Sequence, residues 1–273
     1  MTDPFLIALD VDGTIVHEDN SLSPSVYETI REVEEAGHEI IIATGRSFPG
    51  TYEICERLDI RPQLLVSANG ALIMRHTKPE FDDERAYTID HVETFDAAPV
   101  LELVRERLPE GQFMVENAEG LRRFTHTTFG WEISHGLRVP FEELAVEPAM
   151  RVVVMSPSHE TEEFLSIVED MGLHQVSYTV GFSSWLDLAP EGVNKATGLA
   201  RVNAELGYHP SRVLSAGDGR NDIEMLEWTA KGEGIAIAMG QAPPVVTAAA
   251  NAKTTSVAED GLVKALRTHV LHA

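Results

Sequence analysis

The sequence predicts an α/β fold in which a parallel-sheet core is interrupted by an inserted α+β domain that carries an antiparallel sheet. Short apolar segments alternate with amphipathic segments up to about residue 75 and again after Pro190, which is typical of βαβ units. The residues between these two regions contain several strand candidates and only two helical segments. Such a composition favours an α+β unit inserted into the core.

The first part of the core is predicted to contain three strands and two helices. Ser23 and Gly37 occupy positions that favour the beginning and the end of the first helix. The expected strands are Phe5–Leu9, His38–Ala43 and Leu64–Ala68, and the expected helices are Pro24–Ala36 and Phe48–Leu58. The third strand leads directly into Asn69-Gly70, a pair that is typical of a tight turn.

The inserted domain is predicted to span residues 81–189, which leaves residues 1–80 and 190–273 as the core. Its expected helices are Phe95–Leu108 and Glu160–Met171, and its expected strands are Gln112–Glu116, Leu121–His126, Arg151–Met155, Val176–Val180 and Ser184–Leu188. In the second part of the core we expect helices at Asn194–Leu206, Asp222–Trp228 and Asp260–Val270, and strands at Arg212–Ala216 and Gly234–Met239.

The composition limits the classes of protein to which the chain can belong. Its 273 residues carry 44 acidic and 21 basic side chains, a formal charge of −23, which argues against a nucleic-acid partner. A single cysteine, Cys55, excludes an internal disulfide bond. Without a signal-like segment or an apolar run long enough to span a membrane, we expect a cytoplasmic protein. The expected oligomeric state, a monomer or a homodimer, is left open by the sequence.

The acidity also affects which substrates the protein can handle. Its overall field repels anions, so a phosphate-binding site in this chain needs local positive charge, for which a divalent cation is the obvious source. Solubility is the alternative reason for the acidity.

The strongest local signal is Asp10-Val11-Asp12-Gly13-Thr14, at the end of the first predicted strand. Because side chains alternate along a strand, Asp10 and Asp12 are expected to project in the same direction. Ligands of open α/β sheets bind at the carboxyl ends of the strands. A pair of carboxylates at this edge favours a bound cation, although either aspartate taken alone is typical of a turn or a helix cap.

Three further segments reach the same predicted site. Thr44-Gly45-Arg46 follows the second strand, and Gly217-Asp218-Gly219-Arg220-Asn221-Asp222 follows the strand Arg212–Ala216. Lys195 lies in the first turn of the helix after the insertion. Each segment alone has an ordinary structural interpretation, but together and in this order they indicate a site for a phosphoryl group and a hard cation.

The ordered set of motifs resembles the haloacid dehalogenase-like (HAD) phosphatase superfamily, and within it the Cof-type branch. The resemblance covers essentially the whole chain and includes Asp10–Thr14, Ala43–Arg46, Ser67–Ala71, Gly192–Lys195 and Gly217–Leu226. It implies a Rossmann-like parallel-sheet core with an inserted α+β cap domain. It also implies Mg²⁺-dependent hydrolysis of a small phosphorylated metabolite, a sugar phosphate being the commonest choice for this type of cap.

The resemblance also implies roles for individual residues. Asp10 resembles the nucleophile that forms an aspartyl-phosphate, and Asp12 resembles the general acid/base. The implied magnesium ligands are Asp10, the backbone carbonyl of Asp12, and Asp218, with Asp222 and Asn221 as supports. Thr44 and Lys195 would hold the phosphoryl group, and Gly45, Arg46, Asn69 and Asn221 complete the expected substrate contacts. Arg220 occupies a position that a small or acidic residue often fills in the family.

Two alternatives remain open at this level. A phosphotransferase or phosphomutase would use Asp10 in the same way but would pass the phosphoryl group to another hydroxyl group. A non-catalytic sugar-phosphate sensor is disfavoured because pure binding needs neither a nucleophile nor a proton donor.

Overall fold

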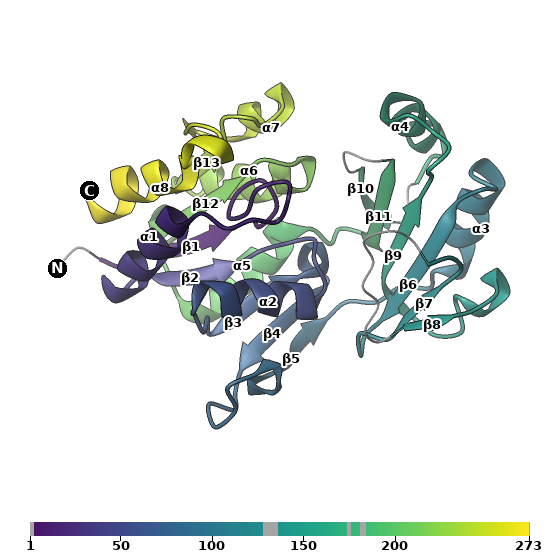
Figure 1. The fold of residues 1–273 in the computed structure, drawn as a ribbon, viewed down its shortest axis with the longest axis horizontal. Coiled ribbons are helices and arrows are strands. Elements are labelled where there is room, and N and C mark those ends of the chain that lie inside the picture. The colour runs from purple at the N-terminus through teal and green to yellow at the C-terminus, as the bar shows by residue number, and fades with distance from the viewer. Residues whose placement is uncertain (1–2, 128–135, 174–175, 181–183, 273) are drawn as a thin grey trace. The chain divides into compact units, whose positions relative to one another are not determined.

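The computed structural model describes residues 3–127, 136–173, 176–180 and 184–272. The chain divides into two compact units, the first formed by Met1–Asp90 and Asn194–Ala273 and the second by His91–Val193. In Figure 1 the purple and blue N-terminal segments and the green and yellow C-terminal segments belong to the same unit. The predicted fold class is confirmed, since a parallel sheet with helices and a separate, largely antiparallel sheet are both present.

The first unit is built on a five-stranded parallel sheet. Its strands are β1 (Leu6–Leu9), β2 (Glu39–Ile42), β12 (Val213–Gly217), β13 (Ile235–Ala238) and β14 (Ala252–Lys253), in the spatial order β14-β13-β12-β1-β2. All four pairs of neighbouring strands are parallel. The four residues of β1 are completely buried, so both faces of the sheet are covered at its centre.

A three-stranded sheet continues the first unit beyond β2. It contains β3 (Leu64–Ser67), β4 (Leu72–His76) and β5 (Tyr87–Val92), and a single parallel bridge between Ala43 and Val66 joins it to the main sheet. The sequence predicted β3 but neither β4 nor β5. The turn between β3 and β4 is Ala68–Gly70, in which all three residues have positive φ angles, so the Asn-Gly pair marks a hairpin.

The helices of the first unit bury apolar faces against the sheet. They are α1 (Pro24–Glu35), α2 (Phe48–Leu58), α5 (Lys195–Leu206), α6 (Ile223–Lys231), α7 (Pro244–Ala249) and α8 (Gly261–Leu266). Leu199 and Val202 of α5 and Met225 of α6 pack in one cluster with Leu6 and Ala8 of β1. The predicted last helix, Asp260–Val270, is shorter than expected, since α8 passes into a π-helical turn at Arg267–Leu271.

The described residues of the second unit form one six-stranded sheet and two helices. Its strands are β6 (Gln112–Asn117), β7 (Arg122–Phe124), β8 (Gly136–Arg138), β9 (Ala149–Met155), β10 (Val176–Val180) and β11 (Trp185–Pro190), in the order β10-β11-β9-β6-β7-β8. The strand pairs are antiparallel except for β7 with β8. The helices α3 (Ala98–Arg107) and α4 (Thr161–Asp170) lie on one face of this sheet (Figure 1), where they pack on its alternate apolar residues.

The other face of this sheet carries a row of alternating charges. Arg122 of β7, Glu116 of β6 and Arg151 of β9 are cross-strand neighbours, and Arg151 forms a two-pronged ion pair with Asp187 of β11 at 2.8 Å. Glu116 is 1% exposed, and one of its oxygens, Oε2, is buried without a hydrogen-bond partner. Burial therefore raises the pKa of Glu116, although Arg122 and Arg151 act in the opposite direction.

Short helical turns connect the longer elements. They are Ala68–Gly70, Glu84–Ala86, Phe141–Glu143, Pro210–Arg212, Arg220–Asp222 and Val257–Glu259. Among the described residues, none of the helices combines the length and the apolar character needed to cross a bilayer.

Candidate active site

The predicted motifs follow strands that are neighbours in the main sheet. Asp10 follows β1, Thr44 and Arg46 follow β2, and Asp218 follows β12, while β1 lies between β2 and β12. Because these strands are parallel, their carboxyl ends bring the three segments to one edge of the sheet. The candidate active site therefore lies entirely within the first unit.

Lys195 connects two of the predicted aspartates. Its ammonium Nζ lies 2.6 Å from Oδ1 of Asp10 and 2.7 Å from Oδ1 of Asp222, and its side chain is completely buried. Burial alone would lower the pKa of Lys195, but Asp10 and Asp222 outweigh it and raise this pKa above its ordinary value. Lys195 is therefore a fixed cation beside the Asp10 carboxylate.

The start of α5 explains how a lysine reaches this depth. Asn194 caps the helix and forms a reciprocal capping box with Thr197, so the first turn that carries Lys195 is firmly placed. One turn later, Gly198 lies against β3, where an added Cβ atom would fall 2.7 Å from Cγ1 of Val66. The absence of a side chain at Gly198 lets α5 approach the sheet closely enough to bury Lys195.

Asp222 organises the loop after β12. Its Oδ2 accepts hydrogen bonds from the backbone N–H groups of Asp218 at 3.0 Å and Gly219 at 2.9 Å, while its Oδ1 accepts from Lys195. Both carboxylate oxygens of Asp222 therefore already accept hydrogen bonds from other groups of the protein. This geometry favours the supporting role that the family resemblance implies for Asp222 over direct contact with a cation.

Asp218 lies against the glycine that follows Asp12. Gly13 has a φ of +80°, and a Cβ atom at this position would fall 2.2 Å from Oδ2 of Asp218. Burial, reinforced by the negative charge of Asp222, raises the pKa of Asp218 to about 6. Only a residue without a side chain leaves room here for the carboxylate of Asp218.

Three buried carboxylates lie around a point where a metal ion could bind. Oxygen atoms of Asp10, Asp218 and Asp222 all lie within 4.8 Å of one another. Burial and the negative charge of Asp222 raise the pKa of Asp10 well above its ordinary value, although Lys195 acts against this rise. Because one ammonium group does not balance three carboxylates in a buried site, the donor set fits a divalent cation with oxygen ligands such as Mg²⁺.

Asp12 has a different environment from Asp10. Its side chain is 63% exposed and forms a two-pronged ion pair with Arg46, with distances of 3.0 Å from Nε and 2.5 Å from Nη2. Burial alone would lower the pKa of Arg46, but its bond to Asp12 outweighs this and raises it. The side chain of Asp12 does not belong to the buried cluster of Asp10, Asp218 and Asp222. Only the backbone carbonyl of Asp12 therefore remains available for the metal contact that the resemblance implies.

The remaining predicted residues form one connected loop cluster. Thr44 accepts a hydrogen bond from the backbone N–H of Arg46 at 3.1 Å, and its carbonyl accepts one from Asn69 at 3.0 Å. The amide of Asn221 donates to Oδ1 of Asn69 at 3.0 Å. Gly45 faces this amide, since its added Cβ atom would fall 3.1 Å from the same Asn69 oxygen. The structure thus brings together every residue of the predicted site.

One polar residue at this edge was not predicted. Gln241 follows β13, the strand next to β12, and its side-chain amide donates to Oδ2 of Asp218 at 3.0 Å and to the carbonyl of Gly13 at 2.6 Å. The sequence did contain a signal for it, because Gln241 lies just past the predicted strand Gly234–Met239 and therefore at the same sheet edge as Asp218.

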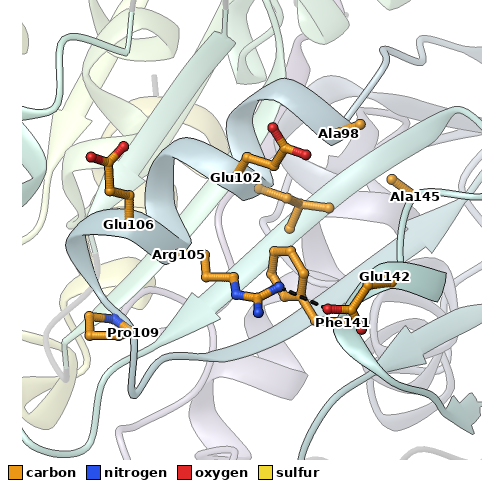
Figure 2. A pocket seen from close by; sticks show the side chains of 9 residues that line it. Ala98, Glu102, Arg105, Glu106, Pro109, Phe141, Glu142 and Ala145 are labelled. Carbon is orange, nitrogen blue, oxygen red and sulfur yellow. Dashed lines mark hydrogen bonds and ion pairs between the residues drawn. The ribbon is translucent and has the colours of Figure 1, made fainter.

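The second unit has a surface hollow that is separate from the predicted site residues. This hollow has a volume of about 610 Å³ and lies between α3 and the turn at Phe141–Glu143. Figure 2 shows its lining side chains, among them Arg105, which lies over the ring of Phe141 and pairs with Glu142. Its lining residues are Ala98, Leu101, Glu102, Arg105, Glu106, Pro109, Phe141, Glu142 and Ala145. None of the predicted site residues is among them.

The chain matches known proteins over almost its entire length. The sequence pattern of the haloacid dehalogenase-like hydrolases matches residues 7–266. A 5-amino-6-(5-phospho-D-ribitylamino)uracil phosphatase of Bacillus subtilis is 25% identical to this chain, with 98% of each chain covered. A phosphoglycolate phosphatase of Natronomonas pharaonis is 30% identical, with 95% of each chain covered.

A solved structure shares the fold. It is a phosphatase of the haloalkanoate enzyme superfamily from Bacteroides thetaiotaomicron, with a TM-score of 0.75 and 26% sequence identity, and the match covers 97% of this chain and 94% of that one.

Proposed function

The chain belongs to the haloacid dehalogenase-like hydrolase family, and on that premise we propose that it hydrolyses a small phosphorylated metabolite in a Mg²⁺-dependent reaction through an aspartyl-phosphate on Asp10. The observation that carries the proposal is the contact of Lys195 with both Asp10 and Asp222, next to the carboxylate of Asp218. The side chains of Lys195, Asp218 and Asp222 come from two separate segments and lie around the buried carboxylate of Asp10. Such an arrangement suits a nucleophile whose target is an anionic phosphoryl group.

In the first step, an oxygen of the Asp10 carboxylate attacks phosphorus as the bond between phosphorus and the ester oxygen breaks. The departing electron pair stays on that oxygen, which takes a proton from Asp12 and leaves as an alcohol. Lys195 balances negative charge beside the phosphoryl group, and the Thr44 hydroxyl is the second proposed contact to it. The product of this step is a mixed anhydride of phosphate and Asp10.

In the second step, water attacks the phosphorus of this anhydride. Asp12, now a carboxylate, accepts the proton of the attacking water, and the bond between phosphorus and the Asp10 oxygen breaks. Inorganic phosphate leaves, and both aspartates return to their starting states.

Asp10, Asp218 and the backbone carbonyl of Asp12 are the proposed magnesium ligands. Bound Mg²⁺ would neutralise charge on the phosphoryl oxygens and orient the phosphoryl group toward Asp10. Asp222 supports this arrangement because it holds Lys195 and the backbone N–H groups of the Asp218 loop.

The Arg46–Asp12 pair has to open, and the freed Asp12 carboxylate has to take up a proton from the solvent, before Asp12 can act as a proton donor. The oxygens of a phosphoryl group match the guanidinium fork of Arg46 and can replace the carboxylate of Asp12 there. We therefore propose that substrate binding transfers Arg46 from Asp12 to the substrate. Asn69 and Asn221, which are joined at 3.0 Å, are the other proposed substrate contacts.

The proposed substrate class is a small phosphate monoester, with a sugar phosphate expected. Two relatives are named as phosphatases of 5-amino-6-(5-phospho-D-ribitylamino)uracil and of phosphoglycolate, so these two compounds are further candidate substrates. We also propose a cytoplasmic location, which suits such substrates. Phosphate release from a panel of phosphorylated metabolites would identify the substrate.

The nucleophile is tested by the variant Asp10→Asn. With p-nitrophenyl phosphate and Mg²⁺ we expect steady release of inorganic phosphate from the wild-type protein and loss of turnover in Asp10→Asn, because an amide oxygen is a poor nucleophile. The matched control is Asp170→Asn, at an exposed position at the end of α4, which should keep the wild-type rate. Normal turnover of Asp10→Asn would refute the role of Asp10.

Phosphoryl transfer to another hydroxyl group is the second candidate, since Asp10 would act identically. Release of inorganic phosphate without an added acceptor would exclude an obligate phosphotransferase or phosphomutase. Formation of a phosphorylated acceptor without release of inorganic phosphate would favour it over hydrolysis.

A further inference from the structure

Gln241 links three segments of the first unit through its side-chain amide. It lies in the turn after β13, and its Nε2 donates to the carbonyl of Gly13 at 2.6 Å and to Oδ2 of Asp218 at 3.0 Å. Its Oε1 accepts from the backbone N–H of Val257 at 3.0 Å. One amide thus joins the loop after β1, the loop after β12 and the turn Val257–Glu259 that precedes α8.

These partners fix the orientation of the amide. A flipped amide would place its oxygen against the Gly13 carbonyl and the Asp218 carboxylate, which are both acceptors, and its NH₂ group against the N–H of Val257. The observed orientation is the one in which every contact pairs a donor with an acceptor. Val257 therefore determines that Gln241 presents N–H groups to Asp218.

The two neighbours of Asp218 restrict its carboxylate from two sides. Oδ2 receives the N–H of Gln241, and the Cα atom of Gly13 is so close that a Cβ atom there would fall 2.2 Å from the same oxygen. The backbone N–H of Asp218 is bound separately to Asp222. The rotamer of Asp218 thus depends on contacts from Gln241 and from the loop after β1.

We propose that Gln241 is a positioning residue for the metal-binding carboxylate of Asp218, which it holds by one charge-assisted hydrogen bond while the turn at Val257 holds its amide in place. The inference rests on the proposed function, in which Asp218 is a magnesium ligand. Groups that orient a metal ligand contribute about 10–100-fold to metal affinity, which is lost when they are removed.

The chain offers a matched control for this role. Gln63 also donates its amide to a carboxylate, that of Glu39 at 3.2 Å, but both residues lie at the amino ends of β2 and β3, the opposite edge from the site. Gln241 is exposed, so replacing it with leucine removes no core packing. Gln241→Leu and Gln63→Leu therefore remove the same kind of hydrogen bond at two different places.

The test measures Mg²⁺ binding to the full-length protein by titration calorimetry, without substrate. We expect Gln241→Leu to raise the Mg²⁺ dissociation constant by about 10-fold or more. Gln63→Leu should leave this constant unchanged.

The outcomes separate this inference from the proposed function. If the wild-type protein binds no Mg²⁺, the proposed metal site itself is refuted, and the inference with it. If the wild type binds Mg²⁺ and Gln241→Leu binds it equally well, Gln241 does not position Asp218 and only the inference is overturned. A lower melting temperature of metal-free Gln241→Leu with an unchanged dissociation constant would likewise assign Gln241 a purely structural role.

Discussion

Asp10 and Asp12 have opposite environments although one residue separates them. Asp10 is 4% exposed and contacts Lys195, whereas the side chain of Asp12 is 63% exposed and pairs with Arg46. The difference suits two different proposed tasks. A nucleophile needs a fixed position beside its cation, and a proton carrier needs access to the leaving group and to water.

Replacement of Asp12 by alanine tests its proposed task. We expect Asp12→Ala to lower kcat by about 10²–10⁴-fold, the usual contribution of general acid/base catalysis, with a much smaller change in KM. Steady-state kinetics with p-nitrophenyl phosphate and with an ester of a more basic alcohol would measure both constants. The loss should be larger for the more basic leaving group, and an effect confined to KM would contradict the assignment.

Among the secondary-structure elements, α5 decides whether the site is complete. Its N-cap at Asn194 and its close packing at Gly198 place Lys195 between Asp10 and Asp222. The hydrophobic periodicity of this helix was visible in the sequence, but its depth against β3 was not. A helix farther from the sheet would leave Lys195 out of reach of both carboxylates.

Gly198→Ala tests this packing. Alanine is the better helix former by about 1 kcal/mol, yet here its methyl group would lie 2.7 Å from Val66, so we expect lower stability and at least a tenfold loss of kcat. Ala204→Gly, at an exposed position of the same helix, is the control. It should cost about 1 kcal/mol of stability and keep kcat. Full activity of Gly198→Ala would show that α5 can shift without loss of the site.

Short or non-periodic elements were the ones that sequence patterns missed. The strands β4 and β5 follow an Asn-Gly pair that predicted only a tight turn, and the alternation of β5 is broken by charged residues such as Asp90. The helix α7 has six residues and begins at a Pro-Pro pair, too short for helical periodicity to emerge. Tertiary contacts hold such elements in place, so local patterns give little sign of them.

At the scale of the whole molecule, the chain forms two units, each with its own apolar core. All the predicted site residues lie in the first unit, while the row Arg122, Glu116, Arg151 and Asp187 belongs to the second. A carboxylate as deeply buried as that of Glu116 is costly to ionise. The stability of the second unit should therefore depend on pH.

The sign of this dependence follows from the raised pKa of Glu116. The unfolded chain releases the Glu116 proton near the ordinary pKa of a glutamate, whereas the folded chain keeps this proton up to its higher pKa. The stability that protonated Glu116 contributes is therefore lost as the pH rises from the unfolded-state pKa to the folded-state pKa. Urea unfolding from pH 5 to 8 should show wild type losing stability relative to Glu116→Gln as pH rises. Glu162→Gln, exposed on α4, is the control, and a constant difference between wild type and Glu116→Gln would contradict the prediction.

The sequence by itself determined the α/β fold class, most strands of both units, and the set of polar residues that follow the core strands. It could do so because alternation, apolar runs and strand-end motifs are local features of the chain. The partners of these residues were decided only by the tertiary structure. Lys195 and Asp10 are 185 residues apart, and Gln241 and Gly13 are 228 apart. Contacts over such separations depend on the strand order and on how closely α5 packs, because sheet topology, not local pattern, determines which loops meet.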